Sequence, residues 1–196
     1  MVTAILLASG FSRRFQKDKL MLDFHGQPVL SHMMETISNC PFHKRLLITQ
    51  SQVHADLAMA HGFIPYINTQ AFLGQSASIK LGVSNASIDS AYMFFVGDQP
   101  CLTMHIINQL LAEYEQYNHS IIVPTMDGNL QNPVIFPPTF REELLSLAGD
   151  TGGKKIFASH PQSIRKIPFT DALPFTDMDT LDEYQHLLQQ SEQENT

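Results

Sequence analysis

The sequence has little of what several classes of protein require. Its 196 residues include only two cysteines, Cys40 and Cys101, which give neither a disulfide framework nor the paired spacing of a thiolate metal site. No apolar run approaches the roughly 20 residues that a membrane span needs. The chain also does not open with the basic segment, long apolar stretch and cleavage site of a secretory leader. These absences indicate a globular protein of the reducing cytoplasm, with no membrane partner.

Positive charge is also scarce. Twelve lysines and arginines stand against nineteen acidic residues, and the formal net charge is −7. Because a phosphate backbone attracts basic surfaces, this balance argues against nonspecific binding to nucleic acid. The nine histidines include no pair four residues apart, so the pattern does not favour a zinc site on one helix face. A small anionic ligand fits this composition if the few cations converge at one place.

Short apolar runs alternate along the chain with stretches of helical period. This alternation is typical of βαβ units around a mainly parallel sheet, so we predict a three-layer α/β/α, Rossmann-like fold. Nothing marks a second domain, and we expect one domain over residues 1–188 and a frayed polar tail over 189–196. The expected strands are 2–8, 45–49, 63–67, 91–96, 120–124, 133–136 and 164–167. The expected helices are 29–38, 53–61, 76–86, 103–117, 140–147, 153–159 and one that opens on a capping box at 180–183.

The first apolar run ends in Leu7-Ala8-Ser9-Gly10, and Arg14 and Lys19 follow it. Small residues leave backbone N–H groups accessible, and Gly10 can adopt the positive φ that folds such amides into an anion-binding nest. With the hydroxyl of Ser12 and the two cations, this segment favours a nucleoside triphosphate as ligand. A plain turn with solvated cations is the alternative.

Residues that follow the later strands carry further information, because ligands of open parallel sheets bind beyond the carboxyl ends of the strands. Asp98 lies in Gly97-Asp98-Gln99-Pro100, directly after a buried strand. A carboxylate at this place suits Mg²⁺, which shares its shell with substrate phosphates, although a turn aspartate looks the same. Gly74-Gln75-Ser76-Ala77-Ser78 opens a helix, where an anion or a base edge can bind or where Ser76 only caps the helix.

Two later segments are candidates for the same edge of the sheet. Residues 128–133 precede an apolar strand and form either a wall of a substrate cleft or a plain loop. Asp177 and Asp179 flank Met178 just before the last helix. In an extended segment their carboxylates point to opposite sides, so one of them can face the site, unless they only complement the helix dipole.

The ordered set of motifs resembles the molybdenum cofactor nucleotidylyltransferases. These motifs are Leu-Ala-Ser-Gly-x-Ser-x-Arg-Phe-x-x-x-Lys, Gly-Gln-Ser-x-Ser, Gly-Asp-Gln-Pro, Asn-Pro-Val-Ile-Phe, Gly-Asp-Thr-Gly-Gly and Asp-Met-Asp-Thr. The resemblance covers residues 2–188 and is greatest to the cytidylyltransferases of this group. It implies a glycosyltransferase-A-like nucleotidyltransferase fold and Mg²⁺-dependent transfer of CMP from CTP to the phosphate of molybdopterin, with release of pyrophosphate.

The resemblance also implies roles for individual residues. Lys19, Arg14 and Asp98 would be catalytic, with the two cations on the triphosphate, and Asp98 would bind Mg²⁺ together with Asp179 or, alternatively, Asp177. The nucleotide would contact Leu7, Ala8, Ser9, Gly10, Ser12, Arg14, Lys19, Gln75, Ser76 and Asp98. The chain departs from the family at Gln16 and Gln131, where glycine is common.

Several alternatives remain open at the level of sequence. The chain could use GTP on the same cofactor, or act on a sugar or alcohol phosphate, since base choice depends on side chains such as Gln50, Asn68 and Gln75. A nucleotide-sugar glycosyltransferase is disfavoured by Arg14 and Lys19, which suit a triphosphate. A non-catalytic protein that binds a nucleotide or molybdopterin is the alternative outside the enzymes. The recipient molybdoenzyme or its maturation factor would be a further partner.

Overall fold

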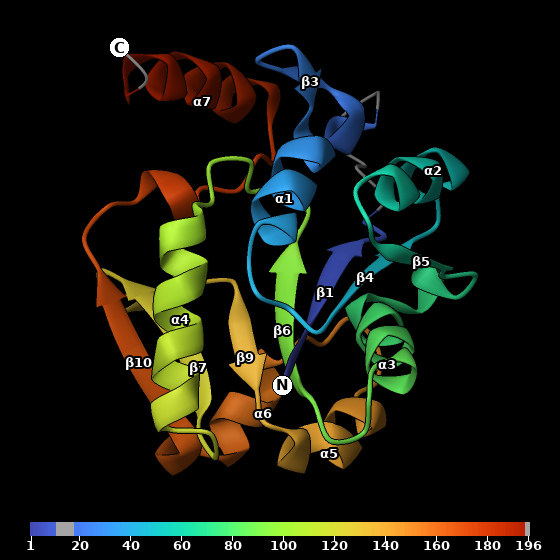
Figure 1. The fold of residues 1–196 in the computed structure, drawn as a ribbon, viewed down its shortest axis with the longest axis vertical. Coiled ribbons are helices and arrows are strands. Elements are labelled where there is room, and N and C mark those ends of the chain that lie inside the picture. The colour runs from blue at the N-terminus through green and yellow to red at the C-terminus, as the bar shows by residue number, and fades with distance from the viewer. Residues whose placement is uncertain (11–17, 195–196) are drawn as a thin grey trace.

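An eight-stranded sheet crosses the middle of the computed structural model, which describes residues 1–10 and 18–194 (Figure 1). Its main path runs β10-β7-β9-β6-β1-β4-β5, and β8 pairs with β7. Neighbours on this path are parallel except where β9 lies antiparallel between β6 and β7. The strands are β1 (Val2–Ala8), β4 (Lys44–Thr49), β5 (Ile64–Ile67), β6 (Ala91–Val96), β7 (Ile121–Met126), β8 (Asn129–Leu130), β9 (Val134–Phe136) and β10 (Ile164–Phe169). The predicted, mainly parallel sheet is confirmed.

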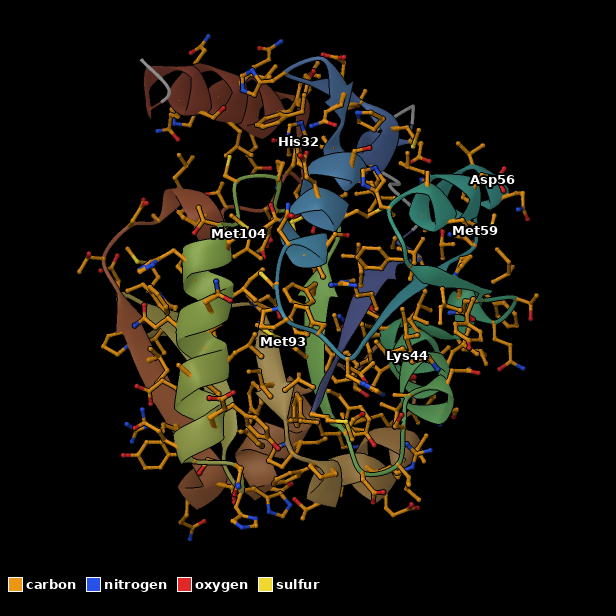
Figure 2. The ribbon with its side chains drawn as sticks, viewed as in Figure 1. His32, Lys44, Asp56, Met59, Met93 and Met104 are labelled. Atoms are coloured by element: carbon orange, nitrogen blue, oxygen red, sulfur yellow. The ribbon has the colours of Figure 1, made fainter. Side chains whose placement is uncertain are left out.

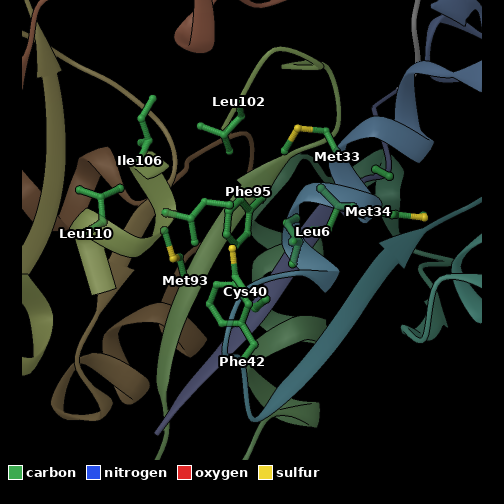
Figure 3. Close-up of a cluster of buried hydrophobic side chains, with 14 of the residues drawn as sticks. Leu6, Met33, Met34, Cys40, Phe42, Met93, Phe95, Leu102, Ile106 and Leu110 are labelled. Atoms are coloured by element: carbon green, nitrogen blue, oxygen red, sulfur yellow. The ribbon is translucent and has the colours of Figure 1, made fainter. Parts of the chain in front are cut away.

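Two hydrophobic cores lie on the two faces of this sheet. Because successive side chains of a strand point to opposite faces, Leu6 of β1 packs in one core and Ile5 in the other. Figure 3 shows part of the first core, where Met33 and Phe95 lie close to Leu6. Helices α1 (Val29–Ser38), α2 (Gln52–Ala60) and α4 (Met104–Gln116) contribute to the first core, and α3 (Gln75–Asn85), α5 (Arg141–Ser146) and α6 (Lys154–Ser159) to the second. The three-layer α/β/α prediction is therefore confirmed.

Helix boundaries follow the sequence pattern closely. Helix α1 spans the predicted 29–38, and the other predicted helices that are named above begin within one residue of their expected start. The outward side of α2 carries the polar Asp56 but also the apolar Met59, and both lie at the surface (Figure 2). Periodic apolar spacing thus located the helices because it reports which face each one buries.

Short elements escaped prediction. The hairpin of β2 (Asp23–Phe24) and β3 (Gln27–Pro28) has too few residues to show a period, and its turn is marked only by positive φ at His25 and Gly26. The same holds for β8 and for the 3₁₀ turns. These turns are η1 (Lys19–Met21), η2 (Ala71–Leu73), η3 (Pro138–Phe140), η4 (Pro161–Ser163) and η5 (Leu173–Phe175).

The last helix, α7 (Leu181–Glu194), begins at the predicted capping box. The Thr180 hydroxyl accepts a hydrogen bond from the backbone N–H of Glu183 at 3.2 Å, and the Glu183 carboxylate accepts one from the N–H of Asp179 at 2.9 Å. The helix continues past 188, so residues 189–194 are helical and not the frayed tail that the sequence predicts. Nε2 of His25 is within hydrogen-bonding distance of the Ser191 hydroxyl, at 2.7 Å. This contact joins the last turns of α7 to the β2–β3 hairpin. No helix of the described residues is both long enough and apolar enough to cross a bilayer.

The start of α3 excludes the interpretation in which Ser76 only caps this helix. The backbone N–H of Gln75 donates to the Asp150 carboxylate at 3.2 Å, and that of Ser76 donates to the carbonyl of Gly149 at 3.3 Å. A segment about 75 residues away along the chain therefore supplies the cap. Gly74 permits this approach, since its φ is +95° and a Cβ there would lie 2.7 Å from the backbone of Asp150.

We expect Gly74→Ala to lower the free energy of unfolding by about 3 kcal/mol, because positive φ strain and a backbone collision add up. Gly62→Ala is the matched control, since Gly62 has a φ of +75° but open space where the Cβ would be. Its loss should be only about 1 kcal/mol. Urea unfolding of both variants measures the difference, and equal losses would show that the contact with Asp150 is not close.

Candidate functional site

The register of two neighbouring strands brings the candidate residues together. Strand β1 lies between β4 and β6, where the strand order reverses. Leu7 is paired with Val96, and the backbone N–H of Gly97 donates to the carbonyl of Leu7 at 3.1 Å. Gly10 and Asp98 therefore leave the sheet at the same edge, which is the usual place for a ligand in an open parallel sheet.

A cavity of about 800 Å³ opens at this edge. Its walls come from the ends of β1 and β6, from η1, from η2 and the start of α3, and from two separate aspartates. The lining residues are Leu7, Ala8, Ser9, Gly10, Lys19, Leu20, Ala71, Phe72, Leu73, Gly74, Gln75, Ser78, Val96, Gly97, Asp98, Asp150 and Asp179. Its size suits a small molecule and is at the upper end of the usual range for ligand pockets.

Lys19 lies in a cage of oxygen atoms at one side of the cavity. Its ammonium is 2.6 Å from Oδ2 of Asp98, 2.9 Å from Oδ1 of Asp179 and 3.0 Å from the carbonyl oxygen of Met178. Burial alone would lower the pKa of Lys19, but the adjacent carboxylates of Asp98 and Asp179 outweigh it, and the net shift is upward. The ammonium therefore stays charged and cross-links η1, the end of β6 and the segment before α7.

The backbone just before Lys19 is fastened to the neighbouring layer. Oδ1 of Asp18 accepts a hydrogen bond from the N–H of Leu20 at 3.2 Å, which caps η1. The other oxygen of Asp18 is 2.7 Å from Nε2 of the buried His54, whose Nδ1 is 3.0 Å from the Thr49 hydroxyl. These contacts hold the backbone beside Lys19 in place. No local sequence pattern predicts them, because Asp18, Thr49 and His54 are not adjacent in the chain.

Asp177 and Asp179 point to opposite sides of their extended segment. Asp179 faces Lys19, whereas Oδ1 of Asp177 accepts a hydrogen bond from Nε2 of Gln99 at 2.9 Å. Desolvation of this carboxyl, with the negative charge of Asp98 as the second cause, raises the pKa of Asp177 to about 6. Asp177 is exposed as a residue, so water screens part of this effect.

Most of the predicted site residues line the cavity. They are Leu7, Ala8, Ser9, Gly10, Lys19, Gln75, Asp98 and Asp179. Ser76 is buried and does not line the cavity, and its backbone N–H donates to the carbonyl of Gly149. Ser12, Arg14 and Gln16 lie outside the described residues.

The backbone at Gly10 differs from the expectation, and the backbone at Gln131 shows whether its conformation needs a glycine. Gly10 does not adopt the positive φ of an anion-binding nest, and a Cβ at Gly10 would meet open space, so its smallness leaves room in the cavity. Gln131 also has no positive φ, and its N–H donates to the carbonyl of Pro124 at 2.9 Å. A glycine is therefore not required by the conformation at 131. Of the described residues, those at 128–133 do not line the cavity.

The side chains suggested for base choice have structural partners. Nε2 of Gln50 donates to the carbonyl of Ser9 at 3.2 Å, and the amide of Asn68 donates to the Ser78 hydroxyl at 2.9 Å. Neither Gln50 nor Asn68 lines the cavity, whereas Gln75 does. The two amides thus bond to residues of the cavity wall, and the dependence of base choice on these side chains stays a prediction.

Sequence reasoning did not select several lining residues, among them Phe72, Leu73 and Asp150. Phe72 and Leu73 lie in η2 directly before Gly74, and Asp150 lies in the Gly-Asp-Thr-Gly-Gly motif. The motif can be recognised in the sequence, but its contact with the start of α3 cannot be predicted from it. An apolar pair in a loop is a weak signal, because loops of globular proteins often carry scattered apolar residues.

Comparison with known proteins gives a family and a fold. The model of the MobA-like NTP transferase domain matches residues 4–164. A probable molybdenum cofactor guanylyltransferase of Pyrococcus horikoshii is 26% identical over 143 residues, which are 72% of each chain. The purine catabolism protein PucB of Bacillus subtilis is 26% identical over 193 residues, 92% of each chain. Further relatives at 21–29% identity also carry the guanylyltransferase name.

Among solved structures, Rv0371c from Mycobacterium tuberculosis H37Rv is similar in fold. Its TM-score is 0.82 at 22% identity, with 96% of this chain and 97% of that chain covered. The complex of the same protein with manganese has a TM-score of 0.79 at 21% identity and covers 96% and 98% of the two chains. At this identity the likeness shows the shared fold.

Asp177→Asn should stabilise the protein above pH 7. A raised carboxyl pKa means that the folded state binds the proton more tightly, so wild-type stability falls as pH rises from about 4 to about 6. Asparagine can still accept the hydrogen bond from Gln99. Because its side chain does not ionise, the loss of stability at high pH disappears. With solvent screening taken into account, we expect a gain of about 1 kcal/mol at pH 7.5 and almost none at pH 4.

Thermal unfolding at both pH values in the presence of a chelator measures this gain, with Asp56→Asn on the outer side of α2 as the control. An equal gain at the two pH values would contradict the shifted pKa.

Proposed function

Since the chain belongs to the MobA-like NTP transferase family and is therefore a nucleotidyltransferase, we propose that it transfers the nucleotide of GTP to a phosphate of molybdopterin and releases pyrophosphate. The observation that carries the proposal is the cavity at the reversal of strand order, with an ammonium and two carboxylates on one side and small or apolar residues on the other. This division suits a ligand with a charged and an uncharged end.

The relatives named as guanylyltransferases favour GTP over the CTP that the sequence predicts. Among the described lining residues, Gln75 carries an amide side chain that can bind a base edge, whereas the carbonyl of Ser9 already accepts a hydrogen bond from Gln50 at 3.2 Å. Molybdopterin as the acceptor is supported by the same relatives and by the motif set.

The oxygen cage around Lys19 fits a divalent cation. Two carboxylates and a carbonyl already surround one positive charge at 2.6–3.0 Å. The described residues hold no cluster of three or more metal-ligating side chains. This agrees with Mg²⁺ or a similar ion, which needs one or two carboxylates and takes water and substrate phosphate oxygens for the rest. Such an ion would neutralise phosphate charge and help the pyrophosphate to leave.

The side chains of the cavity suit direct transfer between the two substrates. The Ser9 hydroxyl donates to the carbonyl of Ile48 at 3.0 Å, and the Ser78 hydroxyl accepts from Asn68, so both take part in the scaffold. Lys19 lines the cavity, so its ammonium is placed to contact a triphosphate that binds there. Its charge then lowers the repulsion between two anionic reactants and stabilises the leaving group.

Lys19→Met and Asp98→Asn should each lower pyrophosphate release by about 10²–10³-fold, the usual effect of removing one preorganised electrostatic group. Binding of Mn²⁺ without nucleotide should separate the two variants. Lys19→Met removes the cation that competes for the oxygen cage and should bind Mn²⁺ more tightly than wild type, whereas Asp98→Asn should bind it more weakly.

Titration of free Mn²⁺ by electron paramagnetic resonance measures this binding. Lys44→Met is the matched control, because Lys44 lies at the start of β4 and donates to the carbonyl of Asn85 (Figure 2). Near-normal turnover of either site variant, or weaker Mn²⁺ binding by Lys19→Met, would contradict the role given to the cage.

Thermal shifts with GTP, CTP, ATP and UTP, each with Mg²⁺, should rank GTP first, because a ligand that binds only the folded state raises its stability. Pyrophosphate should then appear only when GTP and molybdopterin are both present. CTP as the sole effective nucleotide would restore the cytidylyltransferase prediction. Binding of GTP without pyrophosphate release would indicate a non-catalytic protein. Turnover with a sugar phosphate would show that the acceptor is a sugar phosphate and not molybdopterin.

A further inference from the structure

Phe72 is an aromatic side chain that the fold leaves in the open. It is 71% exposed although it lines the cavity, and Ala71 beside it is buried. A phenylalanine exposed to water loses the favourable free energy that burial would supply. Single exposed apolar residues are common on protein surfaces, but this one lies at the edge of a cavity whose other features already indicate a ligand.

The backbone that carries Phe72 is fixed at both ends. At the start of η2, the N–H of Gln70 donates to the side-chain oxygen of Asn68 at 3.0 Å. At its end, the N–H of Gly74 donates to the carbonyl of Ala71 at 3.0 Å, and Gly74 itself lies against the backbone of Asp150. The aromatic ring is therefore presented by a fixed turn, which favours binding because little order has to be created.

Phe72 and the charged side of the cavity lie beyond the carboxyl ends of different strands, which gives the scale of the cavity between them. Asp98 follows β6 and Phe72 follows β5, and three strand spacings separate β6 from β5 through β1 and β4. At the usual spacing this is about 14 Å. A ligand with phosphates near Lys19 and a flat ring at its other end could reach both.

We infer that Phe72 stacks on the planar base of the nucleotide bound in this cavity. The inference rests on the proposed function for the class of ligand and adds the residue that holds the base. Stacking is tolerant of base identity, because every base has an aromatic face. Phe72 thus contributes affinity, while the amide side chain of Gln75, which also lines the cavity, can distinguish bases.

The absence of tryptophan from the sequence allows a direct test. Phe72→Trp gives the protein a single tryptophan at the position in question. We expect its fluorescence to be quenched by GTP with Mg²⁺ and unchanged by tripolyphosphate with Mg²⁺, which has the charge but no base. Ile88→Trp is the matched control, since Ile88 is 66% exposed in the turn before β6, at the opposite edge of the sheet, and should respond to neither.

Affinity separates stacking from simple apolar contact. Phe72→Leu keeps an apolar side chain without a ring and should raise the dissociation constant of GTP by a factor of about 5 to 150, the usual range for one stacked base. Phe72→Tyr should bind GTP nearly as wild type does. Neither variant should change the affinity for tripolyphosphate, which isolates the effect to the base.

Three outcomes would overturn the inference. They are wild-type affinity for GTP in Phe72→Leu, equal quenching by GTP and tripolyphosphate, and quenching only by a pterin without nucleotide, which would assign the ring to the acceptor. None of these measurements requires turnover. Quenching by GTP without pyrophosphate release would therefore contradict the proposed function and leave the stacking role intact.

Discussion

One ammonium group joins three distant parts of the chain. Lys19 contacts Asp98, 79 residues away, and Asp179, 160 residues away, and also the carbonyl of Met178. The neighbouring Asp177 adds a third carboxyl to this small region, in a protein with a net charge of −7. Without a cation among them, these carboxylates would repel one another, so the geometry of the cavity depends on a positive charge held at this point.

Much of the fold and part of the candidate site could be predicted from sequence. The apolar periods of α1 and β1 are local and long enough to read, and the rule that ligands bind beyond parallel strands selected Lys19, Asp98 and Asp179, which lie together. The alternation of side chains along an extended segment predicted that Asp177 and Asp179 would face different ways.

The remainder depends on contacts that no local pattern reports. Asp150 reaches the start of α3 from 75 residues away, and His54 bonds Asp18 from 36 residues away. Capping of α3 by Ser76 was one of two interpretations of its position, because serine is a good capping residue, yet contacts of the backbone N–H groups of Gln75 and Ser76 supply another cap. Phe72 was missed for the opposite reason, since exposure of an apolar residue becomes informative only when a cavity is known to lie beside it.

The oxygen cage around Lys19 also depends on residues that lie beyond the last strand of the sheet. The sheet is complete when β10 ends at Phe169, and a fragment that stopped there would retain every strand. It would nevertheless lose Met178 and Asp179, and with them two of the three oxygens that hold the ammonium. The smallest fragment that keeps all three oxygens around Lys19 is therefore longer than the smallest complete sheet, and it ends no earlier than Asp179, ten residues after the last strand.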